Sequence, residues 1–441
     1  MILLLCNSGC GLLNSTDTLE FQPSEVPVGP LAIGVWLPAG LDRFRFEAED
    51  QERLVELGIN QIEWLQRASQ DSATAEEIAM AFCNRTGVSM PVYYEPPGYS
   101  PYDKLRNWAT RTEVEADFAD SVRERVQSLQ QQWSGASGFY GYMVGHEDYR
   151  KTYSTALRRT VEVLRQEDPL RPALTVGSIG DYASVETFMD AFFVAGGPPN
   201  IFQHEHYVFR QDVPLSGKGL QRRLRDLVRG YESVARHLQG RHGRWHAIVQ
   251  AQGEVRHGEV FYRQPSAAEF RVQAGLALSQ GASGIIYFLY SSGIEEILDQ
   301  EGALVEQREY MGLVDRDGAP TPGYFAVQQL NGWLQRLSGA LQELHFHGGF
   351  SAQKTPRNPL LRSAAEDLAF GLFGDGVNAS HLLVVNRRTT EDREVELEVY
   401  GKQVTDAVSG EELEVLDGKF QVRLEGGGFR LLKTALRSTE E

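Results

Sequence analysis

The chain has 441 residues, of which 41% are hydrophobic and 10% aromatic, and its 43 Lys and Arg against 60 Asp and Glu give a formal net charge of −17. This length exceeds one ordinary domain but suits a barrel of roughly 250–350 residues with a smaller partner domain. A strongly acidic chain repels phosphate backbones, so we expect no nucleic-acid partner. No run reaches the roughly 18 apolar residues of a membrane span.

The N-terminal stretch MILLLCNSGCGLLNS is apolar and ends in a small-residue pair before Cys10. It resembles the tail of a bacterial lipoprotein signal, although no basic residues precede it and Asn7 stands where that signal prefers Leu. The resemblance implies a product of the bacterial cell envelope, periplasmic or extracellular, with Cys10 as the site of a lipid anchor. We assign residues 1–30 to this segment and a linker. Cys6 and Cys83 add neither metal spacing nor a disulfide framework, and we expect no metal and no cofactor.

From residue 31 onward, short apolar runs alternate with helical patterns, some of which begin at capping boxes such as Thr74-x-x-Glu77 and Ser266-x-x-Glu269. Eight strands, each followed by a helix, make up a closed (β/α)8 barrel. The rival fold, an open doubly wound sheet, normally has a Gly-rich phosphate loop after its first strand, and WLPAGLDRF has none. The predicted strands span residues 31–38, 59–65, 88–96, 138–150, 172–178, 200–209, 244–254 and 282–292.

After about residue 340 the pattern changes to short alternating strands, such as HLLVVNRR and REVELEVY, separated by turn signals at Asp375-Gly376 and Asp417-Gly418. This pattern predicts a small antiparallel β-sandwich over residues 341–441. The predicted fold is therefore α/β, with a TIM barrel over residues 31–340 followed by an all-β sandwich domain.

Barrel enzymes place their active sites at the C-terminal ends of the strands. The fourth predicted strand, GFYGYMVGHEDYR, stays apolar and then turns acidic at that end. Alternation along the sixth and seventh predicted strands brings further acids and amides to the same mouth. The residues that we expect there are Trp36, Tyr94, His146, Glu147, Glu205, Tyr207, Gln250, Gln252, Glu254 and Tyr290.

Paired carboxylates between aromatic walls are what cleavage of a glycosidic bond requires. One carboxyl group protonates the leaving oxygen, and the other attacks the anomeric carbon or activates a water molecule. Aromatic faces stack on sugar rings, while amides and histidines bond to hydroxyl groups. A single acid at a strand end can equally be a capping or salt-bridging residue, but Glu147, Glu205 and Glu254 converge on one mouth.

This layout resembles the clan A glycoside hydrolases, which include the family 5 and family 42 enzymes. GFYGYMVGHED is similar to their strand-four signature, and RQPSAAEFRVQAGLALSQGASGIIYFLY is similar to the end of such barrels. The resemblance implies Glu147 as the acid/base, with His146 in place of the usual Asn. The nucleophile of the clan ends strand seven, where Gln250 or Gln252 stands here. Glu254 is therefore the favoured nucleophile, and Glu205 is the alternative.

The leading hypothesis is a retaining glycoside hydrolase that acts on a glycan or oligosaccharide. The alternative is a carbohydrate-binding barrel that is catalytically weak or silent and keeps the aromatic mouth. A barrel aldolase or a metal-dependent hydrolase is less well supported. No Lys lies in any predicted barrel strand to form a Schiff base, and His204 and His206 point away from the barrel axis if Glu205 faces in.

Overall fold

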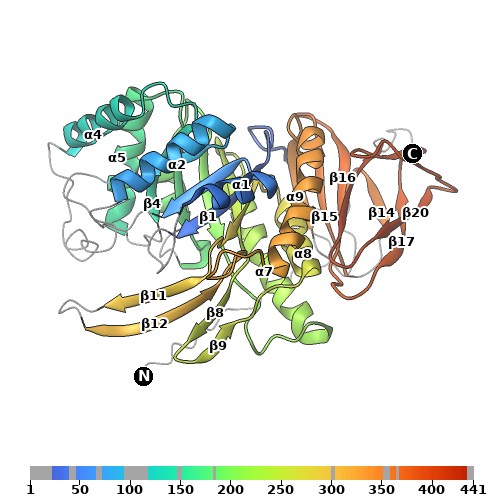
Figure 1. Cartoon of the computed structure of the whole chain (residues 1–441). Coiled ribbons are helices and arrows are strands. Elements are labelled where there is room, and N and C mark those ends of the chain that lie inside the picture. The colour runs from blue at the N-terminus through green and yellow to red at the C-terminus, as the bar shows by residue number, and fades with distance from the viewer. Residues whose placement is uncertain are drawn as a thin grey trace.

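In the computed structural model, eight parallel strands form one sheet in the order β2-β1-β10-β7-β6-β5-β4-β3. A parallel bridge between Gln61 and Ser89 joins the two outermost strands, where the Ile62 amide donates to the Ser89 carbonyl at 2.9 Å. The sheet is thus a closed barrel, which confirms the predicted fold (Figure 1). The structure describes residues 22–38, 46–65, 72–93, 118–146, 151–181, 185–298, 303–350, 358–363 and 367–434.

All eight predicted barrel strands are present within the described residues. They are β1 (Ala32–Pro38), β2 (Gln61–Leu65), β3 (Met90–Tyr93), β4 (Phe139–His146), β5 (Ala173–Gly177), β6 (Asn200–Glu205), β7 (Gly243–Gln250) and β10 (Gly284–Phe288). The helices that surround them are α1 (Ala48–Glu56), α2 (Ser72–Thr86), α4 (Phe118–Gln132), α5 (Lys151–Glu167), α6 (Val185–Phe192), α7 (Gly217–Leu238), α8 (Ala267–Ser279) and α9 (Pro322–Leu341).

Local signals set the ends of several of these helices. Gly58 and Gly87 adopt φ values of +68° and +76° just after α1 and α2, a conformation that glycine adopts without strain. The capping box at Ser266 starts α8 as predicted. The box predicted at Thr74 is wrong, because α2 already begins at Ser72.

Both faces of the barrel strands are buried, which explains why the strands read as continuous apolar runs. On β7, Ile248 packs inside the barrel, whereas Ala247 and Val249 pack against the helices. On β4 the predicted alternation fails at the start, since Phe139 packs outward and Met143 inward. The pairing of β4 with β3 shifts register between Phe139 and Gly141, and this shift changes which residues of β4 face the interior.

A second sheet, which the sequence analysis did not predict, continues from the C-terminal ends of β7 and β10. It contains β8 (Gly253–Arg256), β9 (Glu259–Tyr262), β11 (Gly293–Leu298) and β12 (Leu304–Met311), in the antiparallel order β11-β12-β8-β9. We call these four strands the mouth sheet, and Figure 1 shows them extending away from the barrel on one side. The predicted seventh strand therefore ends at Gln250 rather than at Glu254.

The C-terminal residues form two antiparallel sheets, as predicted. One has the order β13-β15-β16-β21-β18-β19 and the other the order β14-β17-β20. Their strands are β13 (His345–Phe350), β14 (Leu361–Ser363), β15 (Leu368–Gly374), β16 (Ala379–Asn386), β17 (Arg393–Val399), β18 (Val404–Asp406), β19 (Glu412–Leu413), β20 (Lys419–Leu424) and β21 (Phe429–Thr434).

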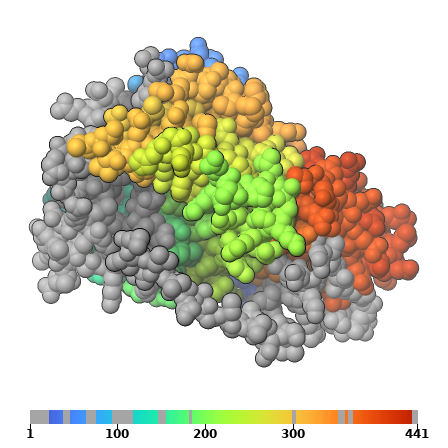
Figure 2. All heavy atoms as spheres, turned by 90° about the horizontal axis from the view of Figure 1, so that it is seen from below, coloured from blue at the N-terminus to red at the C-terminus, as the bar shows by residue number. Residues whose placement is uncertain are grey.

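The larger of these sheets is also buried on its second face, against the barrel helices. A Cβ atom placed on Gly275 of α8 would lie only 2.8 Å from the Phe429 ring and 2.9 Å from Val385. Figure 2 shows the sandwich, in red, against the green region that includes α7, where the Gln221 amide donates to the Arg387 carbonyl at 2.9 Å. The sandwich therefore supports the outer wall of the barrel.

None of the described helices is long and apolar enough to cross a membrane. The predicted lipid-anchor segment, including Cys10, lies outside the described residues.

Candidate functional site

Five aromatic side chains gather where the barrel strands end and the mouth sheet begins. The Tyr207 ring stacks on Phe288 at 5.7 Å between centroids and meets Tyr262 edge-on at 6.0 Å. Phe288 also makes edge contacts with Trp36 at 6.5 Å and with Tyr310 at 6.2 Å. We call this group (Trp36, Tyr207, Tyr262, Phe288 and Tyr310) the mouth aromatic cluster. Trp36 and Tyr310 are buried, whereas Tyr207, Tyr262 and Phe288 are partly exposed and present apolar surface at this end of the barrel.

Glu205 is a carboxylate at the edge of this cluster. It is the last residue of β6 and is half-buried. The hydroxyl group of Tyr207 lies 3.5 Å from Glu205 Oε2, so the acid and the stacked rings belong to one site. Both residues were predicted at the mouth from the alternation along the sixth strand, and the structure places both there.

The predicted acid/base, Glu147, lies outside the described residues, and so does Tyr94. His146 ends β4, where it pairs with Val176 of β5. The backbone of β4 therefore leads to the same end of the barrel as β6.

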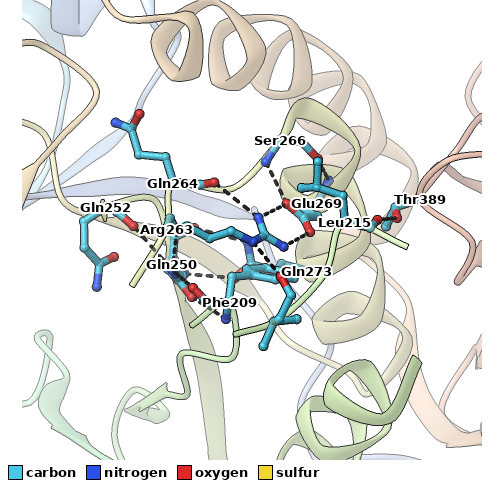
Figure 3. Close-up of polar contacts among 11 residues, drawn as sticks. Phe209, Leu215, Gln250, Gln252, Arg263, Gln264, Ser266, Glu269, Gln273 and Thr389 are labelled. Atoms are coloured by element: carbon cyan, nitrogen blue, oxygen red, sulfur yellow. Dashed lines mark hydrogen bonds and ion pairs between the residues drawn. The ribbon is translucent and has the colours of Figure 1, made fainter. Parts of the chain in front are cut away.

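The end of β7 carries an amide rather than a carboxylate, and that amide is held by the backbone around it (Figure 3). Gln250 Oε1 accepts from the Phe209 amide at 2.9 Å. Its Nε2 donates to the carbonyls of Phe209 at 3.2 Å and Arg263 at 3.0 Å. The main chain of Gln250 is bonded in turn to the side-chain amide of Gln273 on α8. Since both N–H donors are used, Gln250 is a structural clamp and not the sugar-binding group that we expected.

Arg263, whose carbonyl takes part in this clamp, is itself held by a buried acid. Its guanidinium group forms two parallel bonds with Glu269, at 2.6 and 2.8 Å, and the Glu269 side chain is only 1% exposed. Figure 3 shows the pair beside Ser266, whose backbone amide Glu269 also accepts. The loop after β9 is thus tied to the start of α8.

We expect Arg263→Met to lower the free energy of unfolding by about 3 kcal/mol, because it leaves the Glu269 carboxylate buried without its cation. Urea unfolding followed by fluorescence measures this change. Arg423→Met removes an exposed guanidinium group from Asp392, with 78% and 54% of the two side chains exposed, and should cost less than about 1 kcal/mol. Equal losses in the two variants would contradict a structural role for the Arg263–Glu269 pair.

Glu254, the favoured nucleophile, lies in the mouth sheet on β8 and not at the end of a barrel strand. Its side chain is 3% exposed and is paired with Arg256, while Arg308 of β12 lies 4.0 Å away. Burial raises the pKa of Tyr310, and the negative charge of Glu254 raises it further. Glu254 thus sits within an arginine cluster that joins two strands of the mouth sheet.

The remaining predicted site residues occupy different places. Trp36 is 2% exposed and meets Phe288 edge-on within the mouth aromatic cluster. Gln252 is buried just after β7, and its Oε1 has no partner among the described residues. Tyr290 does not line the mouth, because it packs between the barrel and the helices and donates to Asp50 of α1 at 3.1 Å.

Sequence reasoning missed three members of the cluster: Tyr262, Phe288 and Tyr310. Two of them lie in segments that were read as loop, and the signal that could have found them is the alternation in EVFY and REYM. Among the described residues, no group of three or more His, Cys, Asp or Glu side chains is placed to hold a metal ion.

No protein-family model and no curated protein matches this sequence. Solved structures share its fold. A catalytic mutant of Gan42B, a GH42 beta-galactosidase from G. stearothermophilus, aligns with a TM-score of 0.56 at 9% identity, over 92% of this chain and 98% of that one. The beta-galactosidase from Bacillus circulans sp. alkalophilus gives 0.56 at 8% identity, over 93% and 100%. AmyP, solved in complex with maltose, gives 0.51 at 14% identity, over 93% and 97%.

This chain spans 60% of the length of another similar structure, the beta-galactosidase from the psychrophilic Marinomonas ef1. At these identities the likeness is one of fold. The resemblance to clan A glycoside hydrolases is confirmed at that level.

Proposed function

We propose that the chain is a glycoside hydrolase, with Glu147 as general acid/base and Glu205 as the second carboxylate. The observation that carries the proposal is the position of Glu205 at the end of β6, half-buried beside the stacked rings of Tyr207 and Phe288. A carboxylate next to an aromatic platform suits a sugar ring that stacks on the platform and presents its anomeric carbon to the acid. The shared fold with GH42 beta-galactosidases supports the same class of reaction.

Glu205 is preferred over Glu254 for electrostatic reasons. A nucleophilic carboxylate needs an available electron pair and a path to the anomeric carbon. The Glu254 side chain is 3% exposed, and its charge is offset by Arg256 and by nearby Arg308. Moving Glu254 out of this cluster would leave Arg256 without its closest acid, with only Glu306 nearby at 3.9 Å. Glu254 is therefore assigned to holding β8 against β12.

The proposed mechanism is retaining. Glu147 protonates the leaving oxygen while Glu205 attacks the anomeric carbon, and Glu147 then activates the water that releases the sugar. Retaining enzymes hold their two carboxyl groups about 5–5.5 Å apart, and inverting enzymes about 6.5–9.5 Å apart. Proton NMR of the first product distinguishes them, since a retained anomeric configuration supports attack by Glu205. An inverted configuration would reassign Glu205 to activating water.

A catalytically silent carbohydrate-binding barrel remains the second candidate, and one observation favours it. The end of β7, where the clan carries its nucleophile, holds Gln250 with its amide fully used by the backbone. Release of reducing ends from a panel of aryl glycosides and polysaccharides separates the candidates. Cleavage supports the hydrolase, whereas saturable binding of a glycan without cleavage supports the binding barrel.

Tyr207→Ala should raise KM for the substrate that the panel identifies by about 2–10-fold with a smaller change in kcat, because it removes one face of the platform. Initial rates over a range of substrate concentrations measure the two constants. Phe325→Ala serves as the control, since this aromatic is 57% exposed on α9. An unchanged KM in Tyr207→Ala would place the sugar elsewhere.

A further inference from the structure

A carboxyl group lies in the centre of the barrel, in a position that the proposed reaction does not use. Glu63 of β2 points inward and is fully buried. In the ring of eight strands β6 lies opposite β2, and Gln203 of β6 reaches across to Glu63. Gln203 Nε2 donates to Glu63 Oε1 at 2.6 Å, and the side-chain amide of Gln61 donates to the same oxygen. The pair therefore joins the two sides of the barrel through its interior.

Two buried oxygens are left over at this contact. Neither Glu63 Oε2 nor Gln203 Oε1 has a hydrogen-bond partner among the described residues. Buried oxygens without donors are rare in folded proteins because each loses its bonds to water. Burial and the Gln203 and Gln61 amides set the pKa of Glu63, and no cation among the described residues contributes to it. A proton on Glu63 Oε2 would turn that oxygen into a donor, and Gln203 Oε1 could then accept from it.

We propose that Glu63 is a carboxylic acid in the folded protein and that its Oε2 hydroxyl group donates to Gln203 Oε1. This bond and the bond from Gln203 Nε2 to Glu63 Oε1 together form a two-point acid–amide pair across the barrel. The proton comes from solvent and returns to it when the acid ionises. The proposal does not depend on the proposed function, since it concerns the barrel interior and not the mouth.

The charged and titratable groups around the pair do not offer Glu63 a cation partner. Tyr140 of β4 and Tyr93 of β3 face the interior. His246 of β7 is buried, and burial lowers its pKa to about 3, so it is neutral. Arg244, lower on β7, donates to the carbonyl of Pro27 at 3.2 Å. Glu205 lies two residues beyond Gln203 on β6 and would add negative charge, which disfavours ionisation of Glu63.

Burial raises the pKa of Glu63 from 4.5 to about 7, although the Gln203 and Gln61 donors act against the rise. A bond that exists only in the protonated form raises the pKa further. Because the folded state holds the proton more tightly than the unfolded chain, this stabilisation is complete below about pH 4.5. It is lost as the pH rises through about 7. Between about pH 4.5 and about pH 7, the ionisation of Glu63 should raise the equilibrium constant of unfolding by at most about tenfold per pH unit.

Glu63→Gln tests the proposal, because an amide at this position can donate to Gln203 Oε1 at every pH. Urea unfolding of both proteins between pH 5 and pH 8 measures the dependence. We expect the wild type to lose stability relative to Glu63→Gln as the pH rises. Glu232→Gln removes another carboxyl group with a raised pKa, on α7, and should keep the Glu63-dependent slope. Parallel pH curves for wild type and Glu63→Gln would overturn the proposal.

Infrared spectroscopy with isotope-labelled glutamate gives a second readout that does not require the Glu63→Gln variant to fold. In a background that carries both Glu147→Gln and Glu232→Gln, neither the proposed general acid nor the α7 carboxyl group contributes. In this background at pH 6, we expect the C=O stretch of a hydrogen-bonded glutamic acid. The absence of that band would overturn the proposal, because Glu63 would then be ionised in the barrel.

Discussion

Glu205→Gln should lower kcat by at least about 10⁴-fold, the upper end of the range for general acid–base catalysis, because the loss of the nucleophile removes the covalent route altogether. The amide keeps the shape of the side chain at the end of β6 but cannot form the bond to the anomeric carbon. Substrates with good and with poor leaving groups should lose rate equally, because both need the attack. Initial rates on one aryl glycoside and one unactivated oligosaccharide measure the two losses, and urea unfolding checks that stability is unchanged.

Glu254→Gln is the matched control for this prediction. It should lower stability, because Arg256 loses its acid and nearby Arg308 loses part of its electrostatic balance, while each folded molecule keeps its rate. The reverse pattern, with Glu254→Gln inactive and Glu205→Gln active, would return the role of nucleophile to Glu254.

Glu147→Gln should lower the rate on substrates with poor leaving groups by about 10²–10⁴-fold, which is the usual contribution of general acid catalysis. Activated aryl glycosides need little protonation and should lose much less. Added azide should partly restore turnover, because it attacks a glycosyl-enzyme without a general base. An unchanged rate on unactivated sugars, with the fold intact, would remove Glu147 from the mechanism and favour the binding barrel.

The fold could be predicted because its signals are local. Apolar runs of strand length, helix caps such as Ser266 and end glycines such as Gly58 are each visible within a few residues of sequence. The mouth sheet could not be predicted in this way. Its strands β8 and β12 pair across more than 40 intervening residues, and EVRHGEVFY reads equally well as a loop when its partner is unknown.

The site was predicted only in part, for the same reason. Alternation along β6 brought Glu205 and Tyr207 to the mouth, since that strand is regular to its end. Alternation along β7 failed for Glu254, because the chain leaves the barrel after Gln250 and enters another sheet. Glu63 was overlooked, because an acid within INQIEWL does not reveal that Gln203 meets it across the barrel.

A crystal structure of the Glu147→Gln protein in complex with a glycan that the wild type cleaves tests the central claim most directly. The account predicts a sugar ring on the face of Tyr207, with its anomeric carbon within about 3–3.5 Å of a Glu205 carboxyl oxygen. A glycan bound away from the mouth aromatic cluster, or one whose anomeric carbon faces Glu254 instead of Glu205, would contradict it.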